Sequence, residues 1–309
     1  GLPPNPQSAN DIEVPPGVGI SSPRLREQVA DYYNCLARLD TGIGLLLATL
    51  EQAGVADQTL VLFINDHGPQ FSRGKGCTYE LAIRAPLLLR WPGVSQAGTV
   101  RPELCSQLDV LPTILDAVGL PPLAGLPGRS LRPLAANQPA PDWPAYLFAE
   151  WHCSHAAPTP GLLNPQRTVR DARYKLHLNL MPDPPNQAEH YYTQQVLVKS
   201  GCTQDEIDAG PPAIRQAYAR WRHQGAVELY DLQQDPHEWH DLAQDPAHAA
   251  TRDHLLAVLR QWQITTRDPL ADPALLARFI ADHARISATA GSHKIPGFRW
   301  PYLDYFPPH

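Results

Sequence analysis

The stretch Leu60-Val-Leu-Phe-Ile-Asn-Asp-His-Gly-Pro69 passes from five apolar residues directly into a polar turn. An apolar run without alternating polar residues is typical of a buried strand in a mostly parallel sheet. Ligands bind at the carboxyl ends of strands in open α/β sheets, so an acid and an imidazole there indicate a metal site at Asp66 and His67. The alternative is an ordinary turn, in which Asp66 accepts backbone hydrogen bonds and Gly68 takes a positive φ.

A glycine-flanked loop, Arg73-Gly-Lys-Gly76, follows this turn within a few residues. The ammonium group of a lysine in such a loop can offset the charge of an anionic substrate that the metal holds. Lys75 is therefore a candidate substrate-binding residue.

The composition describes a globular protein with a large core. The chain has 309 residues, of which 43% are hydrophobic and 18% charged, and this length favours two unequal domains. The net charge is only −6 and no Lys/Arg-rich run occurs, so nucleic acid is not an expected partner. No apolar stretch has the length of a membrane span. The five cysteines are scattered without a C-x-x-C pair, which favours neither a zinc site nor a disulfide framework.

The first part of the chain has the pattern of a layered α/β domain. Apolar residues recur at three- and four-residue spacing over residues 24–53, which predicts an amphipathic helix that Gly54 ends. A second strand is expected at residues 86–90. A further helix is expected at residues 108–119, with Asp109 as its N-terminal cap.

A proline-rich stretch, residues 121–144, is expected to cross between two domains. We place the catalytic α/β domain at residues 1–135 and an α+β subdomain with a tail at residues 136–309. Short strand-like runs separated by turns predict a small antiparallel sheet in the second domain. The strands are expected at 145–151, 167–170, 174–179 and 227–232, and a long helix at 247–266.

Several polar residues of the second domain allow two interpretations. His152 and His155 follow a predicted strand, and they either line a substrate pocket or serve as surface and packing residues. The segment Asp235-Pro-His-Glu238 is interpreted as a turn. The basic residues of the predicted hairpin are interpreted first as its solvated face and second as partners of a substrate acid; they are Arg167, Arg170, Arg173 and Lys175.

A series of short motifs runs in order from about residue 24 to about residue 270. They are Asp31-Tyr-Tyr, Leu39-Asp-Thr-Gly-Ile-Gly44, Thr59–Gly68, Lys75 with Tyr79-Glu80, Arg84-Ala-Pro-Leu87, Asp109–Asp116, Gly128–Leu131, Glu228–Asp231 and Asp235–Ala243. In this order and spacing they resemble the C-terminal half of a type I sulfatase, in the alkaline-phosphatase-like superfamily. Gln166-Arg-Thr-Val-Arg170 before Tyr174–Asn179 looks most like the heparan N-sulfatase (N-sulfoglucosamine sulfohydrolase) group.

The resemblance implies a fold, a reaction and cofactors. The implied fold is an alkaline-phosphatase-like mixed sheet sandwiched by helices, plus a small C-terminal antiparallel sheet with a long helix. The implied reaction is hydrolysis of sulfate esters or sulfamates of sulfated sugars. Sulfatases use a formylglycine made from the Cys or Ser of a C/S-x-P-x-R motif, and a Ca²⁺ ion that polarises the sulfate oxygens. By this matching Asp66 and His67 are calcium ligands, and Lys75 binds the substrate sulfate.

The sequence departs from the family pattern at the nucleophile. None of the five cysteines lies in a C-x-P-x-R context, no Ser-x-Pro-x-Arg replaces it, and the paired aspartates that complete the calcium site are missing. We therefore expect the chain to be the C-terminal portion of something longer, inactive by itself. The alternatives are a fragment or pseudoenzyme that binds carbohydrate or a partner, and a phosphodiester or phosphonate monoester hydrolase. By family analogy the compartment is periplasmic, secreted or lysosomal, although no signal peptide is visible. A homo-oligomer is compatible with the sequence, which leaves the oligomeric state open.

Overall fold

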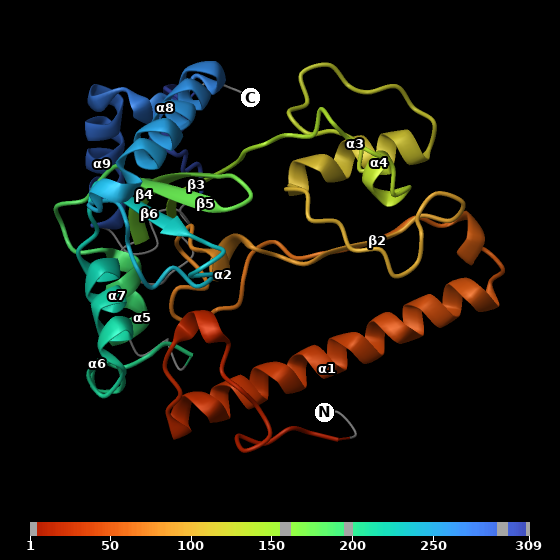
Figure 1. Cartoon of the computed structure of the whole chain (residues 1–309), viewed down its shortest axis with the longest axis horizontal. Helices are drawn as coiled ribbons and strands as arrows, with labels where there is room; N and C mark the ends of the chain where they lie inside the picture. Colours follow the sequence, from red (N-terminus) through yellow and green to blue (C-terminus); the bar gives the residue numbers. More distant parts are fainter. Residues whose placement is uncertain (1–4, 155–161, 195–199, 289–295, 307–309) are drawn as a thin grey trace. The chain divides into compact units, whose positions relative to one another are not determined.

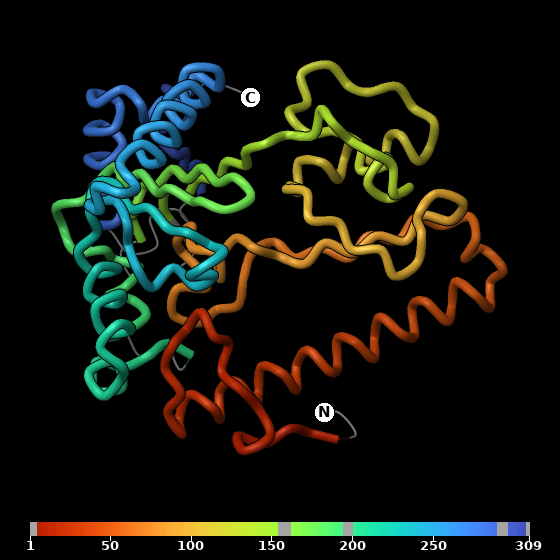
Figure 2. Tube along the Cα trace, in the orientation of Figure 1, coloured from red at the N-terminus to blue at the C-terminus, as the bar shows by residue number. Residues whose placement is uncertain are grey.

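The structure of the chain is a computed structural model that describes residues 5–154, 162–194, 200–288 and 296–306 (Figure 1). The chain divides into two compact units, each built from several segments. Unit 1 comprises Gly1–Val14, Ser21–Gly68 and Arg84–Leu147, and unit 2 comprises Pro15–Ile20, Pro69–Ile83 and Phe148–His309. The trace in Figure 2 shows the path along which the chain passes from one unit to the other.

The compact units interleave along the chain, whereas the sequence predicts a single division at residues 135 and 136. The segment 69–83 belongs to unit 2 because its buried side chains bond residues of that unit. Arg73 donates to the carbonyl oxygen of Glu238, and Glu80 accepts from Arg170. The division into domains at residue 135 stays a prediction.

Unit 1 contains the 30-residue helix α1 (Pro23–Gln52), where the periodic apolar pattern predicts it. The Ser22 hydroxyl caps its first turn by accepting the N–H of Leu25 at 3.1 Å. Pro23 occupies the first helical position, where the backbone N–H has no partner within the helix, so proline loses no hydrogen bond there. Gly54, just past the helix, has a φ of +69°, so it takes the left-handed conformation predicted for a glycine at this end.

The two strands of unit 1 pair antiparallel. In β1 (Val61–Ile64) and β2 (Leu87–Arg90), Val61 lies opposite Arg90 and Ile64 opposite Leu87. Both strands lie where the sequence predicts them, but the expected parallel neighbour of β1 is not found in the described part of the chain. β1 is also only partly buried, with Ile64 38% exposed. An apolar run indicates a strand, but it does not set the direction of the strand that pairs with it.

Asp109 occupies the N-cap position of the helix after β2, as predicted, but its side chain makes no capping hydrogen bond to that helix. A single 3-10 turn, η3 (Gln107–Asp109), precedes α3 (Val110–Ala117), and the side-chain cap of this turn is Ser106, three residues upstream. In the resulting capping box, the Ser106 hydroxyl accepts a backbone N–H of the first turn, and Asp109 Oδ2 accepts the N–H of Ser106 at 2.8 Å. Asp109 is thus the reciprocal acid of the box.

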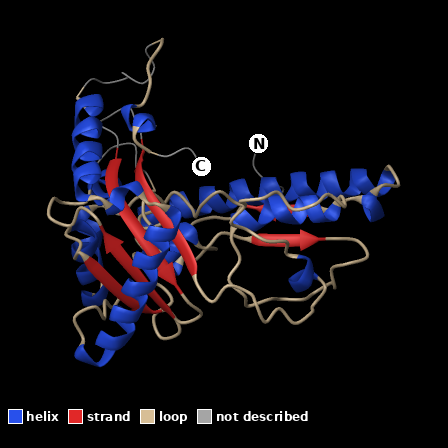
Figure 3. Cartoon of the chain, turned by 90° about the horizontal axis from the view of Figure 1, so that it is seen from above, coloured by secondary structure: helices blue, strands red, loops and turns tan. Residues whose placement is uncertain are grey.

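Unit 2 is built around the antiparallel sheet that the sequence predicts, seen as red arrows in Figure 3. The strand order is β3-β4-β5-β6, and β5 pairs antiparallel with both β4 and β6. The register places Lys175 opposite Tyr230 and His177 opposite Glu228. The strands are β3 (Leu147–Ser154), β4 (Leu162–Arg170), β5 (Tyr174–Asn179) and β6 (Val227–Asp231).

Helices pack against this sheet. The predicted long helix is α8 (Ala249–Thr266), which contacts β4 and β5, and α5 (Gln187–Gln194) contacts β4. Leu163, Leu270 and Phe279 form a buried hydrophobic cluster in this unit. The other α-helices described are α2 (Glu80–Ile83), α4 (Arg132–Ala135), α6 (Gln204–Asp208), α7 (Pro212–Arg222) and α9 (Pro273–Ser287).

All five cysteines carry free thiols, as the absence of a disulfide pattern predicts. Within the described ranges, no helix combines the length and the apolar character that a membrane span needs.

Candidate functional site

The strand end that carries Asp66 and His67 is an exposed turn of unit 1. Asp66 Oδ1 accepts the N–H of His67 at 3.0 Å, and the Asp66 side chain is 80% exposed. His67 Nδ1 lies 2.8 Å from the carbonyl oxygen of Gly68, which only accepts hydrogen bonds, so Nδ1 carries a proton. Gly68 does not have a positive φ, so that part of the turn interpretation is wrong.

The contact between the two side chains is compatible with an ion pair or with a shared cation. With its proton on Nδ1, a neutral His67 ring presents a bare Nε2 to Asp66 Oδ2, and these two atoms are 3.2 Å apart. Two lone pairs at that distance repel each other unless a second ring proton or a metal ion lies between them. Two donors supply only part of the roughly six to eight ligands that Ca²⁺ takes. No group of three or more His, Cys, Asp or Glu side chains in the described residues is placed to hold a metal.

Lys75 lies in a loop of unit 2 whose backbone conformation is narrowly fixed. A Cβ atom on Gly74 would lie 2.2 Å from the carbonyl oxygen of Pro69, so only glycine fits at this position. Gly76, on the other side of Lys75, has a φ of +74°. Lys75 itself is half-buried and forms no ion pair with any residue that the structure describes. No described carboxylate thus neutralises its ammonium group.

Arg73 anchors this loop in the interior of unit 2. Its buried guanidinium donates from Nη2 to the carbonyl oxygens of His237 and Glu238, at 3.0 and 2.9 Å. The same group lies over the rings of Tyr79 and Trp239, 4.0 and 4.5 Å from their centroids. These contacts satisfy a charge that would be costly to bury alone.

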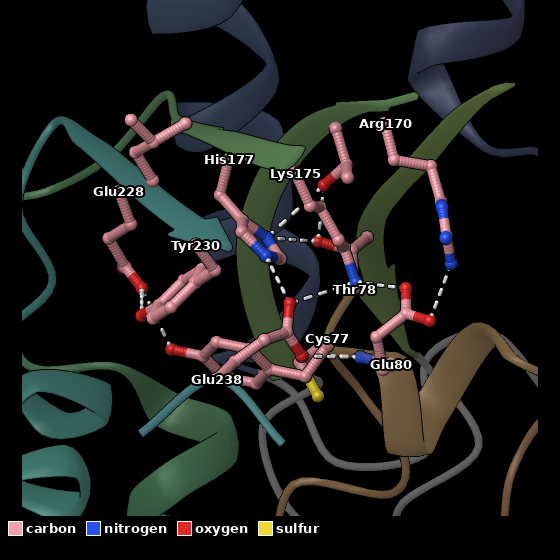
Figure 4. Close-up of polar contacts among 12 residues, drawn as sticks. Cys77, Thr78, Glu80, Arg170, Lys175, His177, Glu228, Tyr230 and Glu238 are labelled. Carbon is pink, nitrogen blue, oxygen red and sulfur yellow. Dashed lines mark hydrogen bonds and ion pairs between the residues drawn. The ribbon is translucent and has the colours of Figure 1, made fainter. Parts of the chain in front are cut away.

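A buried network of charges adjoins the loop (Figure 4). Lys175 Nζ lies 3.0 Å from Glu80 Oε1 and 3.0 Å from Glu238 Oε1, and the Lys175 side chain is completely buried. Glu80 Oε2 accepts from Arg170 Nη1 at 2.6 Å. Two carboxylates and two cations thus compensate one another, and all but Arg170 are buried.

His177 extends the network into a chain of hydrogen bonds. Its Nε2 lies 2.9 Å from Glu238 Oε1, and its Nδ1 lies 2.9 Å from the hydroxyl of Thr78. The Thr168 hydroxyl donates to that of Thr78 at 2.7 Å. Glu238 Oε2 accepts the backbone N–H of Glu80 at 2.6 Å, so both oxygens of the Glu238 carboxylate are occupied.

A second buried carboxylate, Glu228, lies beside this network. Its Oε2 accepts the phenol protons of Tyr79 and Tyr230, at 3.1 and 2.6 Å, and its Oε1 accepts from Asn179 Nδ2 at 2.8 Å. Burial raises the pKa of both tyrosines well above the usual value, so they remain donors at neutral pH.

Burial alone would raise the pKa of Glu238, but Lys175 and the hydrogen bond from His177 hold it down, at about 2. Glu238 is therefore ionised throughout the physiological range. Burial raises the pKa of the Cys77 thiol to about 12. Cys77 lies close to Lys75 in the sequence, but with this raised pKa its thiol is protonated at neutral pH.

The structure corrects the interpretation of the basic residues in the β4–β5 hairpin. Arg167 and Lys175 are completely buried, and Arg167 pairs with Asp268 at 2.6 Å. Of the four basic residues, Arg173 is the most exposed, at 46%. The face that carries Arg170 and Lys175 is covered because residues 69–83 and the segment after β6 return onto it, as the bonds of Glu80 and Glu238 show. Arg167 lies on the opposite face of the sheet, where Asp268 pairs with it.

The two histidines proposed for a pocket give separate outcomes. The ring of His152 meets those of Phe279 and Phe306 edge-on, at centroid distances of 6.0 and 5.9 Å, and its Nε2 is 3.6 Å from Glu150 Oε2. The substrate-binding role of His152 stays a prediction. His155 lies outside the described residues.

Among the other predicted site residues, Asp66 and His67 belong to unit 1 and Lys75 to unit 2. The residues that the site interpretation missed are Glu80, His177 and Glu238. The sequence of β5 contains one signal of this network. Its polar residues alternate with apolar ones, and they include a histidine and an asparagine, which a strand face turned to solvent does not require.

Comparison with known proteins identifies the family. The family model described as Sulfatase matches residues 4–120, and the model described as N-sulphoglucosamine sulphohydrolase, C-terminal, matches residues 71–191. The chain belongs to the sulfatase family. It is 34% identical to human N-sulphoglucosamine sulphohydrolase over 282 residues, which cover 84% of the chain and 52% of the human protein. The chain therefore spans about half the length of this curated sulfatase.

Solved structures show the same fold. A 2-O GAG sulfatase superposes with a TM-score of 0.59 at 20% identity, over 84% of the chain and 49% of that protein. The phosphonate monoester hydrolase of Agrobacterium radiobacter superposes with a TM-score of 0.54 at 25% identity, over 77% of the chain and 42% of that enzyme. The sulfatase chain thus has the alkaline-phosphatase-like α/β fold that its motifs predict, with the small antiparallel sheet of unit 2.

Proposed function

We propose that the protein carrying this chain hydrolyses sulfate esters or sulfamates of sulfated sugars, with an N-sulfoglucosamine unit as the preferred substrate. The observation that carries this proposal is the half-buried Lys75, which no described carboxylate neutralises, on a loop anchored by the buried Arg73. The name of the human relative supports the choice of sugar.

Lys75 binds the sulfate group in this proposal. A cation at a fixed position stabilises the negative charge that develops on sulfate oxygens in the transition state, and it does so without reorganising. Gly74 and Gly76 on either side allow the backbone to hold Lys75 in a conformation that residues with side chains disfavour.

Asp66 and His67 contribute part of a calcium site in this proposal. This assignment is supported by the exposed carboxylate of Asp66 and by the imidazole Nε2 that lies 3.2 Å from it. A bound Ca²⁺ would polarise the sulfate oxygens as a Lewis acid. The other calcium ligands and the formylglycine nucleophile belong to no motif of these 309 residues, so we propose that a further segment supplies them, in the same chain or in a partner.

The test compares substrates and Lys75 variants in the complete protein. We expect turnover of N-sulfated glucosamine to exceed that of O-sulfated glucosamine. Lys75→Ala should lower kcat/KM by about 10²- to 10³-fold, as the loss of one transition-state donor does, and Lys75→Arg should retain part of the activity. The melting temperature should be nearly unchanged, because Lys75 forms no ion pair with the described residues. Equal activity of Lys75→Ala and wild type would remove Lys75 from the site.

A second candidate function is hydrolysis of phosphonate monoesters. It is favoured by the likeness to the Agrobacterium radiobacter enzyme, at 25% identity. The same preparation assayed on an aryl sulfate and on phenyl phenylphosphonate decides between the two, because the better substrate reveals which oxyanion the site stabilises. A protein that binds sulfated sugar but turns over neither compound would instead be a non-catalytic carbohydrate-binding member of the family.

A further inference from the structure

Glu238 accepts hydrogen bonds from the loop of Lys75 at a residue before the lysine and at a residue after it. Two residues before Lys75, the side chain of Arg73 donates to the backbone carbonyl of Glu238 at 2.9 Å. Five residues after it, the backbone N–H of Glu80 donates to Glu238 Oε2 at 2.6 Å. One residue, distant in sequence, thus holds both ends of the segment 73–80.

The backbone at both partners is in a conformation that side-chain-bearing residues seldom adopt. Arg73 has a φ of +65° and Glu238 a φ of +60°, and they are two of the four non-glycine residues with positive φ in the described chain. Such conformations cost free energy and persist where the surroundings over-determine them. Arg73 and Glu238 are also hydrogen-bonded to each other. We infer that this contact holds the loop 73–80 in one conformation.

The side chain of Glu238 is itself held in place from the sheet. Its Oε1 lies 3.0 Å from Lys175 Nζ and 2.9 Å from His177 Nε2, both on β5. The close contacts of Glu238 therefore connect the rigid strand β5 to the loop, as Figure 4 shows for its carboxylate.

We propose that Glu238 is a positioning residue for Lys75, fixing the loop 73–80 on β5 so that the ammonium group is presented to the substrate sulfate in one place. This inference rests on the proposed role of Lys75. Glu238 is buried and acts through the loop, without touching the substrate.

Amide hydrogen exchange tests the clamp independently of activity. In Glu238→Gln we expect exchange in peptides covering residues 73–80 to accelerate about tenfold or more, while peptides from α1 stay unchanged. Asp268→Asn is the matched control, because Asp268 is another buried carboxylate paired with an arginine of unit 2, and its hydrogen bonds do not involve this loop. Loop exchange that is the same in Glu238→Gln as in the wild type would overturn the inference.

Kinetics of the complete protein test the consequence for Lys75. A displacement of about 1 Å costs on the order of 10²-fold in rate, so Glu238→Gln should lower kcat/KM by about 10- to 100-fold and weaken inhibition by inorganic sulfate. In a Lys75→Ala background the same substitution should cause little further loss. A merely structural role would lower activity equally in both backgrounds, and that outcome would overturn the inference.

A second variant covers the case in which Glu238→Gln does not fold. Arg73→Lys keeps the positive charge but loses the guanidinium fork that reaches the carbonyls of His237 and Glu238. It should accelerate exchange in the same loop and be non-additive with Lys75→Ala. If the wild-type protein shows no hydrolase activity, the proposed function fails, and hydrogen exchange still decides whether Glu238 holds the loop.

Discussion

The ammonium nitrogen of Lys175 lies 3.0 Å from Glu238 Oε1, and neither side chain is reached by solvent. The pair joins β5 to the loop that follows β6, and Glu80 adds a third segment at the same distance from the lysine. Glu80 also pairs with Arg170 and Glu238 also bonds His177, but Lys175 is the completely buried cation that both carboxylates share. Removal of the lysine therefore deprives each buried carboxylate of one partner, which costs more than the pair contributes.

Lys175→Met should lower the free energy of unfolding by about 3–5 kcal/mol, the usual cost of breaking a buried ion pair. The methionine matches the length of the apolar stem, so packing changes little, while Glu80 keeps only Arg170 and Glu238 keeps only His177 as a side-chain partner. Urea unfolding measures the effect. Arg173→Ala is the control, because Arg173 pairs with Asp231 while 46% exposed and should cause a much smaller loss. Similar losses for the two variants would contradict this account.

Acid should destabilise the protein through Glu238. The folded-state pKa of Glu238 is about 2, below its ordinary value of 4.5, so the unfolded chain binds this proton first. The stabilisation is complete above about pH 4.5 and is lost as the pH falls toward 2. The free energy of unfolding measured across this window should fall more steeply in the wild type than in Glu238→Gln. Parallel curves would show that Glu238 does not titrate in this way.

Asp66→Ala should remove calcium from the complete protein and with it most of the activity. The reason is that Asp66 supplies the carboxylate oxygen of the proposed site, and imidazole alone is a poor ligand for a hard cation. Elemental analysis of the dialysed protein measures the bound calcium. Asp57→Ala removes another exposed acid of unit 1 and should leave the calcium content unchanged. Unaltered calcium in Asp66→Ala would refute the ligand assignment.

The chain of 309 residues, purified alone, should not hydrolyse an aryl sulfate. It contains no C/S-x-P-x-R motif from which the nucleophile is made, and Cys77 remains a protonated thiol with a pKa of about 12. The assay is release of the phenol with and without added calcium, with the complete protein as the positive control. Calcium-dependent turnover by the isolated chain would show that the nucleophile lies within these residues.

Local patterns predict the elements well. Most elements lie within a few residues of their expected places, namely α1, β1, β2, α8 and the four strands of unit 2. The exception is the N-terminal end of β4, which begins at Leu162 and not at the expected Arg167. Apolar periodicity and capping residues depend only on residues close together in the chain, so a single sequence is enough to recognise them. The family was predictable for a related reason, because its motifs are short and occur in a fixed order.

The sequence by itself therefore determined the elements, the family and the candidacy of Asp66, His67 and Lys75. Only the tertiary structure decided that the polar face of β5 is buried. Burial of Lys175 and His177 depends on residues 69–83 and the segment after β6 returning to cover them. Alternation along a strand states which side chains share a face, but it does not state whether water or another segment of the chain meets that face.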